Sequence, residues 1–241
     1  MRNCKACPLR QSPAFLSMTD EEESYMQTLK TGERHVRAGQ NVLSAGEDSD
    51  MLYTVLDGLG LRSVPLPDGE RQVVGFVLPG DFLGLQAGVM NEMDHSVTAT
   101  TDMILCCFPK TRLWDLFRNC PARAYDITHL AAREESLLGE ALSVIGQKAA
   151  TERVAWALHK LFVRLRRIEP SSGNAVALPY RQQDLADALG LSLVHTNKTL
   201  ARLRDQGLAD WSARRLVVPD PDRLYAETGL DADAYRPRPL L

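Results

Sequence analysis

Residues 180–210 constrain the fold of this chain more than any other stretch, because they predict two short helices joined by a tight turn. Leu185, Ala188 and Leu189 recur at helical spacing and give the first helix one apolar face. Gly190 is expected to end this helix, since a left-handed conformation costs least for glycine. Ser192 then caps the second helix by accepting a hydrogen bond from its first turn.

The second helix has one face for the core and one for a partner. We expect Thr196, Thr199, Leu200 and Leu203 on the inward face, and Val194, Asn197, Lys198 and Ala201 on the outward face. The outward face is narrow and carries one cation and one amide, which suits insertion into the major groove of DNA. The alternative is an ordinary helical hairpin, in which Lys198 and Arg202 only solvate the surface.

A basic hairpin follows this helix pair. Residues 208–220 predict a strand, a turn that carries Arg214 and Arg215, and a second strand. A helix-turn-helix followed by such a hairpin is the winged arrangement of DNA-binding domains. We expect the two arginines near phosphates, which fix the register of a protein on DNA without reading its sequence.

Charge is distributed unevenly along the chain. The net charge of −3 over 241 residues argues against general affinity for nucleic acids. Residues 148–218, however, contain 12 Lys and Arg against 6 Asp and Glu, a net charge of +6, so the rest of the chain carries −9. One basic module joined to an acidic one is the asymmetry expected when a single part of a protein meets DNA.

Other features exclude several classes of protein. No stretch of about 18 apolar residues exists to span a membrane, and the N-terminus lacks the apolar core of a signal peptide. Five cysteines are an odd and sparse set for a secreted disulfide framework, so we expect a reducing cytoplasm. An enzyme is not expected, because the five histidines fall in different elements without a nucleophile beside them. Residues 80–84 are glycine-rich, but they sit among predicted strands with no helix start behind them, so we expect no phosphate cradle there.

The N-terminal half predicts strands after one helix that runs from about Thr19 to Lys30. Apolar or β-branched runs at 51–56, 60–64, 72–78 and 96–108 alternate with Gly and Asp turns. Many short strands at this spacing predict a sandwich or a rolled barrel.

A long helix is predicted from Pro121 to about Lys148. A stripe at steps of three and four runs along it: Tyr125, Thr128, Ala132, Glu135, Leu138, Leu142 and Ile145. Such a stripe often packs inside its own chain. Because this one lies between a strand module and a DNA module, we expect it to pair with a second copy of the chain.

Two thiols stand near the N-terminus, at Cys4 and Cys7. Thiols at positions i and i+3 can bind one metal or cluster, or can pair with each other. The alternative is a pair of reduced, exposed thiols without chemistry.

A strand module, a long helix and a winged helix-turn-helix, in this order, resemble the Crp/Fnr family of bacterial transcription regulators. The motif Gly80-Asp81-Phe82-Leu83-Gly84 and residues 182–203 carry the resemblance most specifically. It implies an α+β fold: an N-terminal β-roll of the cyclic-nucleotide-binding (jelly-roll) kind, a dimerisation helix and a C-terminal winged helix-turn-helix. The implied boundaries are a cysteine segment at 1–18, a sensory roll at 19–120, the helix at 121–148, the DNA-binding domain at 149–230 and a disordered tail at 231–241.

The same resemblance implies a homodimer that binds double-stranded DNA at a two-fold symmetric promoter site. The two recognition helices would then lie one DNA turn apart, about 34 Å. RNA polymerase is a further expected partner if the protein activates transcription. The roll would sense a redox, oxygen or other signal. A small-molecule effector, or constitutive activity without thiol chemistry, is the alternative.

The family's cyclic-nucleotide sensors follow the glycine motif with a Glu for the ribose and an Arg-Ser pair for the phosphate. Here these positions are Leu85 and His95-Ser96. Leucine cannot accept a ribose hydroxyl, and a mostly neutral histidine is a poor substitute for a guanidinium. We therefore expect no useful binding of cAMP. The effector pocket implied by the resemblance consists of Gly80, Asp81, Gly84, Leu85, His95 and Ser96.

The oxygen-sensing branch holds an iron–sulfur cluster on three N-terminal cysteines and one cysteine of the roll. Cys4 and Cys7 resemble the first pair and Cys106 the ligand of the roll, but the third N-terminal cysteine, expected near Pro13, is missing. Cys107, Cys120 or a carboxylate could replace it. A thiol switch between Cys4 and Cys7, and thiols that are inert, are the alternatives.

In the recognition helix, the family's Glu and Arg positions are occupied by Val194 and Lys198. Lys198 still reaches guanine acceptors, though without a bidentate fork, and Val194 offers only an apolar contact, for example with a thymine methyl. The family's usual half-site is therefore not assumed. The predicted DNA-binding residues are Gln182, Ser192, Val194, His195, Asn197, Lys198, Arg202, Arg214 and Arg215.

Overall fold

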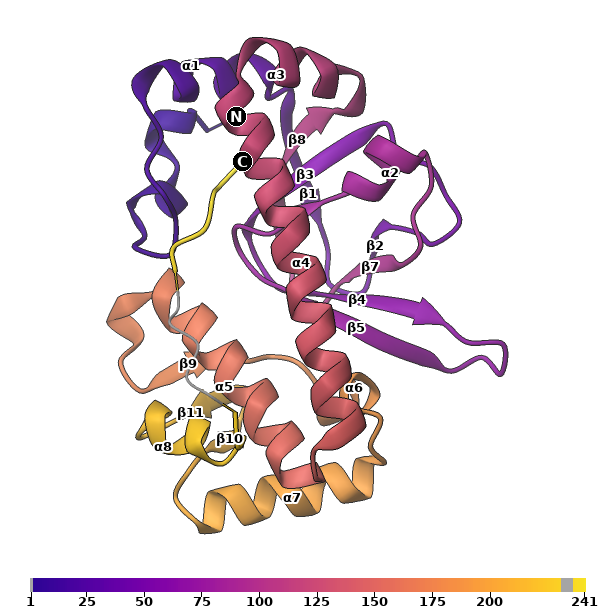
Figure 1. Cartoon of the computed structure of the whole chain (residues 1–241), viewed down its shortest axis with the longest axis vertical. Helices are drawn as coiled ribbons and strands as arrows, with labels where there is room; N and C mark the ends of the chain where they lie inside the picture. Colours follow the sequence, from indigo (N-terminus) through magenta and orange to yellow (C-terminus); the bar gives the residue numbers. More distant parts are fainter. Residues whose placement is uncertain (1, 231–235) are drawn as a thin grey trace. The chain divides into compact units, whose positions relative to one another are not determined.

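The computed structural model describes residues 2–230 and 236–241 of the chain (Figure 1). It contains two compact units: Met1–Glu135 with Pro237–Leu241 is the N-terminal unit, and Ser136–Arg236 is the C-terminal unit. None of the helices in this part of the chain has the length and apolar character that a membrane crossing requires.

The N-terminal unit is a roll of two antiparallel four-stranded sheets. One sheet has the order β1-β8-β3-β6 and the other β2-β7-β4-β5. The strands are β1 (Gly32–Val36), β2 (Asn41–Leu43), β3 (Met51–Asp57), β4 (Gly60–Pro65), β5 (Arg71–Val77), β6 (Phe82–Leu83), β7 (Ser96–Ala99) and β8 (Met103–Pro109). Both sheets contribute to one core, which includes Val55, Val77, Val97 and Leu105, all 0 % exposed. Alternation along each strand places these side chains on the inner face.

Helices complete this unit: α1 (Asp20–Leu29), α2 (Leu85–Met90), α3 (Leu113–Asn119) and the first part of α4 (Pro121–Gln147). The predicted start of α1 is confirmed. Thr19 Oγ1 accepts a hydrogen bond from the Glu22 amide, and the Glu22 carboxylate accepts one from the Thr19 amide. This reciprocal cap satisfies two amides that the helix itself leaves unpaired.

Three expectations for this half of the chain were wrong. The run 96–108 is two strands, because the amides of Thr100 and Thr101 turn to donate to the Leu59 carbonyl. A short helix, α2, does begin directly behind the glycine motif, after Gly84 in a left-handed conformation. Residues 237–241 are not a disordered tail: Leu240 and Leu241 are buried in the N-terminal unit. Residues 231–235 lie outside the described part.

The C-terminal unit contains the second part of α4 and the helices α5 (Ala150–Ile168), α6 (Gln182–Leu189), α7 (Leu193–Asp205) and α8 (Pro221–Ala226). A three-stranded antiparallel sheet has the order β10 (Asp210–Ser212), β11 (Arg215–Val217) and β9 (Ala175–Ala177). The core of this unit includes Leu158, Phe162, Leu203 and Leu216, each 0 % exposed. The α+β fold, with a roll, a long helix and a C-terminal winged helix-turn-helix, is therefore confirmed.

The hairpin between β10 and β11 contains local backbone strain. Ser212 pairs with Arg215, so the two residues between them form the turn. Ala213 and Arg214 both have positive φ, 45° and 63°. This turn geometry favours Gly or Asn, because a Cβ is crowded in the left-handed region.

We predict that Ala213→Gly raises the free energy of unfolding of this unit by about 0.5–1 kcal/mol, since relief of strain exceeds the entropy cost of glycine. Chemical denaturation measures the change. Ala177→Gly, in the neighbouring strand β9, is the matched control and should destabilise the unit. A loss of stability in Ala213→Gly comparable to that of the control would contradict the interpretation of the turn.

Candidate DNA interface and thiol cavity

The two helices α6 and α7 meet at a turn whose chemistry follows the sequence closely. Gly190 ends α6 with φ of +62°, and Ser192 Oγ accepts a hydrogen bond from the His195 amide at 3.2 Å. The inward residues of α7 are buried, with Thr196 and Leu203 at 0 % exposure. The predicted division of α7 into two faces is confirmed, and the helix is held rigidly against its own unit.

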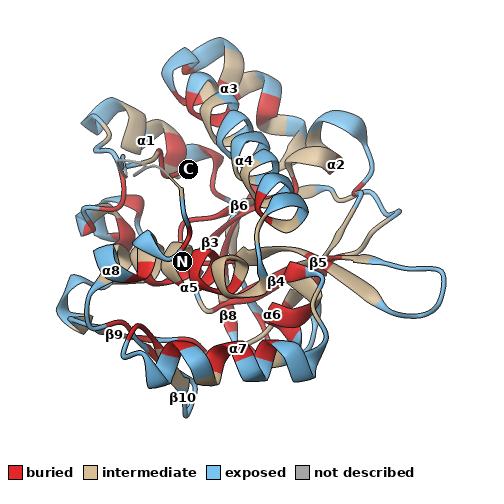
Figure 2. Cartoon of the chain, turned by 60° about the horizontal axis from the view of Figure 1, so that its bottom comes forward, coloured by how far each residue is buried: buried red, intermediate tan, exposed pale blue. Residues whose placement is uncertain are grey.

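The other face of α7 is open (Figure 2). Val194 is 65 % exposed, and His195, Asn197 and Lys198 are exposed beside it. Of the nine predicted DNA-binding residues, the structure places eight at exposed positions and Gln182, the first residue of α6, at a half-buried one. One cation, one amide and one imidazole on a protruding helix can meet the acceptor and donor edges of base pairs.

The wing lies directly after this helix in the chain. The Trp211 indole donates to the Leu178 carbonyl at 2.9 Å, which fixes the hairpin to the strand segment before α6. Arg214 stands in the turn as predicted, whereas Arg215 is the first residue of β11 rather than part of the turn. Both arginines are exposed. They form a cationic hairpin tip suited to phosphate contacts.

Sequence reasoning missed Arg181, which stands one residue before α6. Its guanidinium bonds to Asp184 at 3.0 Å, while its own side chain stays 71 % exposed and that of Asp184 is 1 % exposed. The buried carboxylate also accepts a hydrogen bond from the Arg181 amide. An Asp three residues into a helix was the available signal for this cap. The pair adds an oriented cation at the start of α6.

Most of the six residues predicted to form an effector pocket have structural contacts within the roll. None of the six lines either of two cavities in the described part of the N-terminal unit, one beside Cys4 and one beside Leu116. Gly80 and Asp81 have structural contacts: a Cβ on Gly80 would lie 2.1 Å from Phe15 Cζ, and Asp81 accepts a hydrogen bond from the Leu78 amide. Gly84 caps α2, which begins at Leu85.

His95 and Ser96 also interact with neighbouring residues of the roll. Burial, and then the nearby Arg62 guanidinium, lower the pKa of His95 to about 4, so its imidazole is neutral at physiological pH. The Ser96 hydroxyl accepts a hydrogen bond from the Ala45 amide at 3.0 Å. Arg62 itself is paired with Glu134 of α4. None of these groups presents a free cation to a phosphate.

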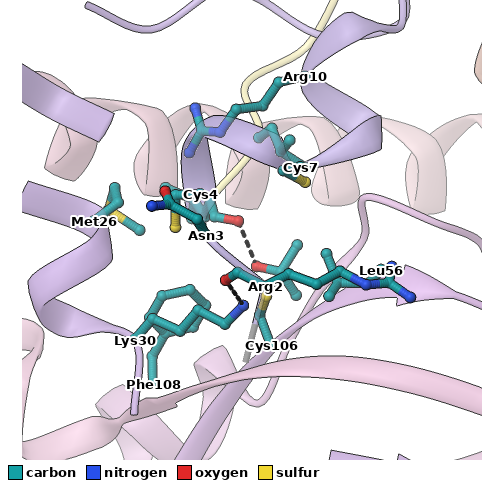
Figure 3. Close-up of a pocket in the computed structure, with 13 residues that line it drawn as sticks. Arg2, Asn3, Cys4, Cys7, Arg10, Met26, Lys30, Leu56, Cys106 and Phe108 are labelled. Atoms are coloured by element: carbon teal, nitrogen blue, oxygen red, sulfur yellow. Dashed lines mark hydrogen bonds between the residues drawn. The ribbon is translucent and has the colours of Figure 1, made fainter. Parts of the chain in front are cut away.

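Three cysteines from distant parts of the sequence line one cavity of the N-terminal unit, which we call the thiol cavity (Figure 3). Cys4 begins the short 3₁₀ turn Cys4–Ala6, Cys7 lies between this turn and the next one at Pro8–Gln11, and Cys106 comes from β8. The remaining lining residues are Arg2, Asn3, Arg10, Met26, Lys30, Thr54, Leu56, Phe108, Leu240 and Leu241. The structure therefore brings together the three cysteines that were predicted to act together.

The thiol cavity is buried but cationic. Lys30 is 5 % exposed, and its ammonium donates to the Arg2 carbonyl and to the Glu33 carboxylate, both at 2.9 Å. Burial lowers the pKa of Lys30, but the hydrogen bond to Glu33 and the neighbouring Cys106 more than offset this and raise it. Sequence reasoning missed Lys30, because a single lysine at the end of α1 carries no motif.

Burial also determines whether the thiols of Cys4 and Cys106 are ionised. It raises the pKa of Cys106 to about 11 and raises that of Cys4 as well, although Lys30 and Arg10 oppose the effect. Both side chains are therefore thiols rather than thiolates at neutral pH, and thiols react slowly with oxidants and metals.

The remaining two cysteines do not complete a ligand set. Cys107 follows Cys106 on β8 and points to the opposite face, into the core of the roll, and Cys120 ends α3; neither lines the thiol cavity. All five cysteines are free. In the described part of the chain, no three His, Cys, Asp or Glu side chains lie close enough to hold a metal ion. Cys4, Cys7 and Cys106 therefore line one cavity without forming a ready ligand set for an iron–sulfur cluster, which takes four ligands.

Comparisons with known proteins agree with this architecture. Residues 33–120 match the model of the cyclic nucleotide-binding domain, and residues 152–227 match the Crp-like helix-turn-helix domain. The solved structure of FixK2 from Bradyrhizobium japonicum superposes with a TM-score of 0.74 at 28 % identity, over 84 % of this chain and 98 % of that chain.

Two characterised relatives align along most of the chain. The transcriptional activator protein FnrL of Cereibacter sphaeroides is 28 % identical over 98 % of this chain and 96 % of its own length. The nitrogen fixation regulation protein FixK of Bradyrhizobium diazoefficiens is 32 % identical over 92 % of both. The chain belongs to the Crp/Fnr family of DNA-binding transcription regulators, in its Fnr/FixK branch.

Proposed function

We propose that this chain is a homodimeric cytoplasmic activator of transcription that binds a two-fold symmetric promoter site and responds to redox state or oxygen through the thiol cavity. The DNA-binding half of this proposal is supported by the exposed face of α7 and the cationic wing. The similar proteins FnrL and FixK are named as an activator and as a regulation protein. As an activator, the protein would also contact RNA polymerase.

The proposed dimer is supported by the surface of α4. Leu138 and Leu142, one turn apart on the helix, are 48 % and 74 % exposed, and Tyr125 near its start is 72 % exposed. Other positions of the helix pack within the chain itself, since Ile127 and Val144 are 4 % and 1 % exposed. An exposed apolar stripe on a long helix favours pairing with a second helix, because burying each leucine contributes about 1.5–3 kcal/mol.

The proposed sensing function rests on one observation: Cys4, Cys7 and Cys106 line the same cavity. Cys106 is far from Cys4 and Cys7 in the sequence, so only the fold brings it to them. Two forms of chemistry suit them. An iron–sulfur cluster would require the three thiols to move closer together than they lie in this structure, and would need a fourth ligand from outside the cavity. Reversible thiol oxidation needs no further ligand, but needs the thiols to ionise first.

The same regulator with a small-molecule effector or constitutive activity is the second candidate. The raised pKa of Cys106 and Cys4 favours it, because unionised buried thiols are commonly inert. We do not expect cAMP to be that effector. The neutral His95 and the paired Arg62 leave no free cation for its phosphate, and Leu85 cannot accept a ribose hydroxyl.

For the DNA interface, we predict that Asn197→Ala and Lys198→Ala each cost about 1–3 kcal/mol of binding free energy on the cognate site. Arg214→Ala and Arg215→Ala should instead weaken binding to all sequences and reduce its salt dependence. Fluorescence-anisotropy titrations at several fixed salt concentrations measure both effects. Arg118→Ala, on α3 of the N-terminal unit, is the control. Unchanged affinity in both α7 variants would refute the placement of α7 in the groove.

For the dimer, we predict that Leu142→Glu converts the protein to a monomer, because two buried carboxylates would face each other across the helix pair. Sedimentation equilibrium measures the mass, and thermal unfolding at low concentration should change little because Leu142 is 74 % exposed in the single chain. Leu66→Glu, at a leucine 39 % exposed beyond β4, is the matched control. A wild type that is monomeric at all concentrations would remove the proposal of a homodimer.

For the thiol cavity, we predict that protein purified without oxygen shows a broad visible band near about 400 nm with matching iron and sulfide, as thiolate-bound clusters do. Cys4→Ser, Cys7→Ser and Cys106→Ser should each abolish the band, whereas Cys107→Ser and Cys120→Ser should leave it. A colourless protein free of iron would eliminate the cluster. Thiol oxidation would then be the surviving form if mass spectrometry after air exposure finds oxidised Cys4, Cys7 or Cys106.

A further inference from the structure

The chain ends on the N-terminal unit rather than on the C-terminal unit that precedes it in sequence. The C-terminal unit spans Ser136–Arg236, and the last five residues, Pro237–Leu241, belong to the N-terminal unit. We call these five residues the C-terminal strap. The C-terminal unit is consequently joined to the N-terminal unit by the covalent chain at both of its ends, through α4 and through the strap.

The strap is held at its start by the N-terminal segment. The Leu16 amide donates to the Arg238 carbonyl at 2.9 Å, and the Arg238 amide donates to the Ala14 carbonyl at 3.1 Å. The Arg238 guanidinium lies over the Phe15 ring, 5.2 Å from its centre. These contacts pair the strap with the polypeptide that follows Cys4 and Cys7.

An ion pair anchors the strap to the roll. The Arg238 guanidinium lies 2.8 Å from the Asp81 carboxylate, and the two side chains are 13 % and 7 % exposed. The same guanidinium donates to the Pro79 carbonyl at 3.3 Å. A charged hydrogen bond at this depth is stronger than a neutral one. Asp81, in the glycine motif of the roll, thus holds the end of the chain.

The end of the strap forms a wall of the thiol cavity. Leu240 and Leu241 are 3 % and 7 % exposed and line the cavity together with Cys4, Cys7 and Cys106. Thr54 Oγ1 donates to the Leu241 carbonyl at 2.7 Å, which fixes Leu241 against β3. Access to the three thiols from this side therefore requires the strap to leave.

We propose that the C-terminal strap is a regulatory cover of the thiol cavity, and that its docking transmits the state of the three thiols to the DNA-binding unit. With the strap docked, Leu240 and Leu241 shield the three thiols from solvent on this side. When molecular oxygen oxidises Cys4 and Cys7 to a disulfide, taking up the two electrons and two protons of the thiols as hydrogen peroxide, Leu240 and Leu241 are displaced, and the second connection from the C-terminal unit to the roll is released. Such coupling needs two states of the protein whose relative stability depends on the cavity. The docked and the undocked strap are these two states.

The covering role is tested by rates of alkylation with iodoacetamide at pH 8, followed cysteine by cysteine by peptide mass spectrometry. The variants are Arg238→Gln and a chain that stops after Arg236. We expect labelling of Cys4, Cys7 and Cys106 to accelerate about tenfold or more in both, because loss of a charged anchor raises the population of the open state. Cys107 and Cys120 are internal controls, and Arg236→Gln, an exposed arginine just before the strap, is the matched control variant.

Unchanged labelling of the three thiols in both variants would overturn the covering role. Faster labelling of all five cysteines would overturn it too, since that pattern reports general loosening of the unit. Should the shortened chain fail to fold, as judged by circular dichroism, Arg238→Gln alone decides, because it removes a single charge.

The transmission role rests on the proposed sensing function and is read separately. DNA affinity is measured with and without dithiothreitol for the wild type and for the chain that stops after Arg236. We expect the shortened chain to lose the difference between the two conditions that the wild type shows. A shortened chain that keeps the full difference would overturn transmission. A wild type without any difference would overturn the proposed sensing function and transmission together, while the alkylation rates still report on the cover.

Discussion

The turn at Gly80 and Asp81 is the constraint on which the N-terminal unit depends. Gly80 has φ of +83° and no side chain, and only this absence makes room for the Phe15 ring, since a Cβ would lie 2.1 Å from it. The neighbouring Asp81 pairs with Arg238. One turn of the roll thereby seats the segment that carries Cys4 and Cys7 and also the end of the chain. Two cysteines from the N-terminus, one from β8 and two terminal leucines meet because of it.

The two units meet different physical demands. In the C-terminal unit, α7 is fixed by fully buried Thr196 and Leu203, so its outward residues are presented by a rigid support, as reading of base edges requires. In the N-terminal unit, Leu240 and Leu241 line the thiol cavity, and burial raises the pKa of Cys4 and of Cys106. The neighbouring Arg10 and Lys30 lower the pKa of Cys4, and Lys30 lowers that of Cys106, but burial has the larger effect on both. Exposure of these thiols to solvent would therefore favour their ionised form.

Local chemistry was predictable from the sequence, and long-range packing was not. The caps at Thr19, Gly190 and Ser192, the faces of α7 and the extent of α4 follow from residues within a few positions of one another. The final Pro-Arg-Pro-Leu-Leu has the composition of a tail, and only contacts to Asp81 and Thr54, far away in sequence, order part of it. The glycine motif was expected to line an effector pocket, whereas its residues are used in packing. That Cys106 faces the cavity and Cys107 the core depends on the register of β8, which the neighbouring strands fix.

The central claim, that the state of the thiol cavity controls DNA binding, is tested most directly by one titration. Promoter DNA carrying a two-fold symmetric site is titrated with the same protein, first kept reduced without oxygen and then exposed to air, at one fixed salt concentration. The account predicts that the two dissociation constants differ by about 5- to 150-fold, the range of ordinary allosteric coupling, and that Cys106→Ser abolishes the difference. Equal dissociation constants for the wild type in both states would contradict it.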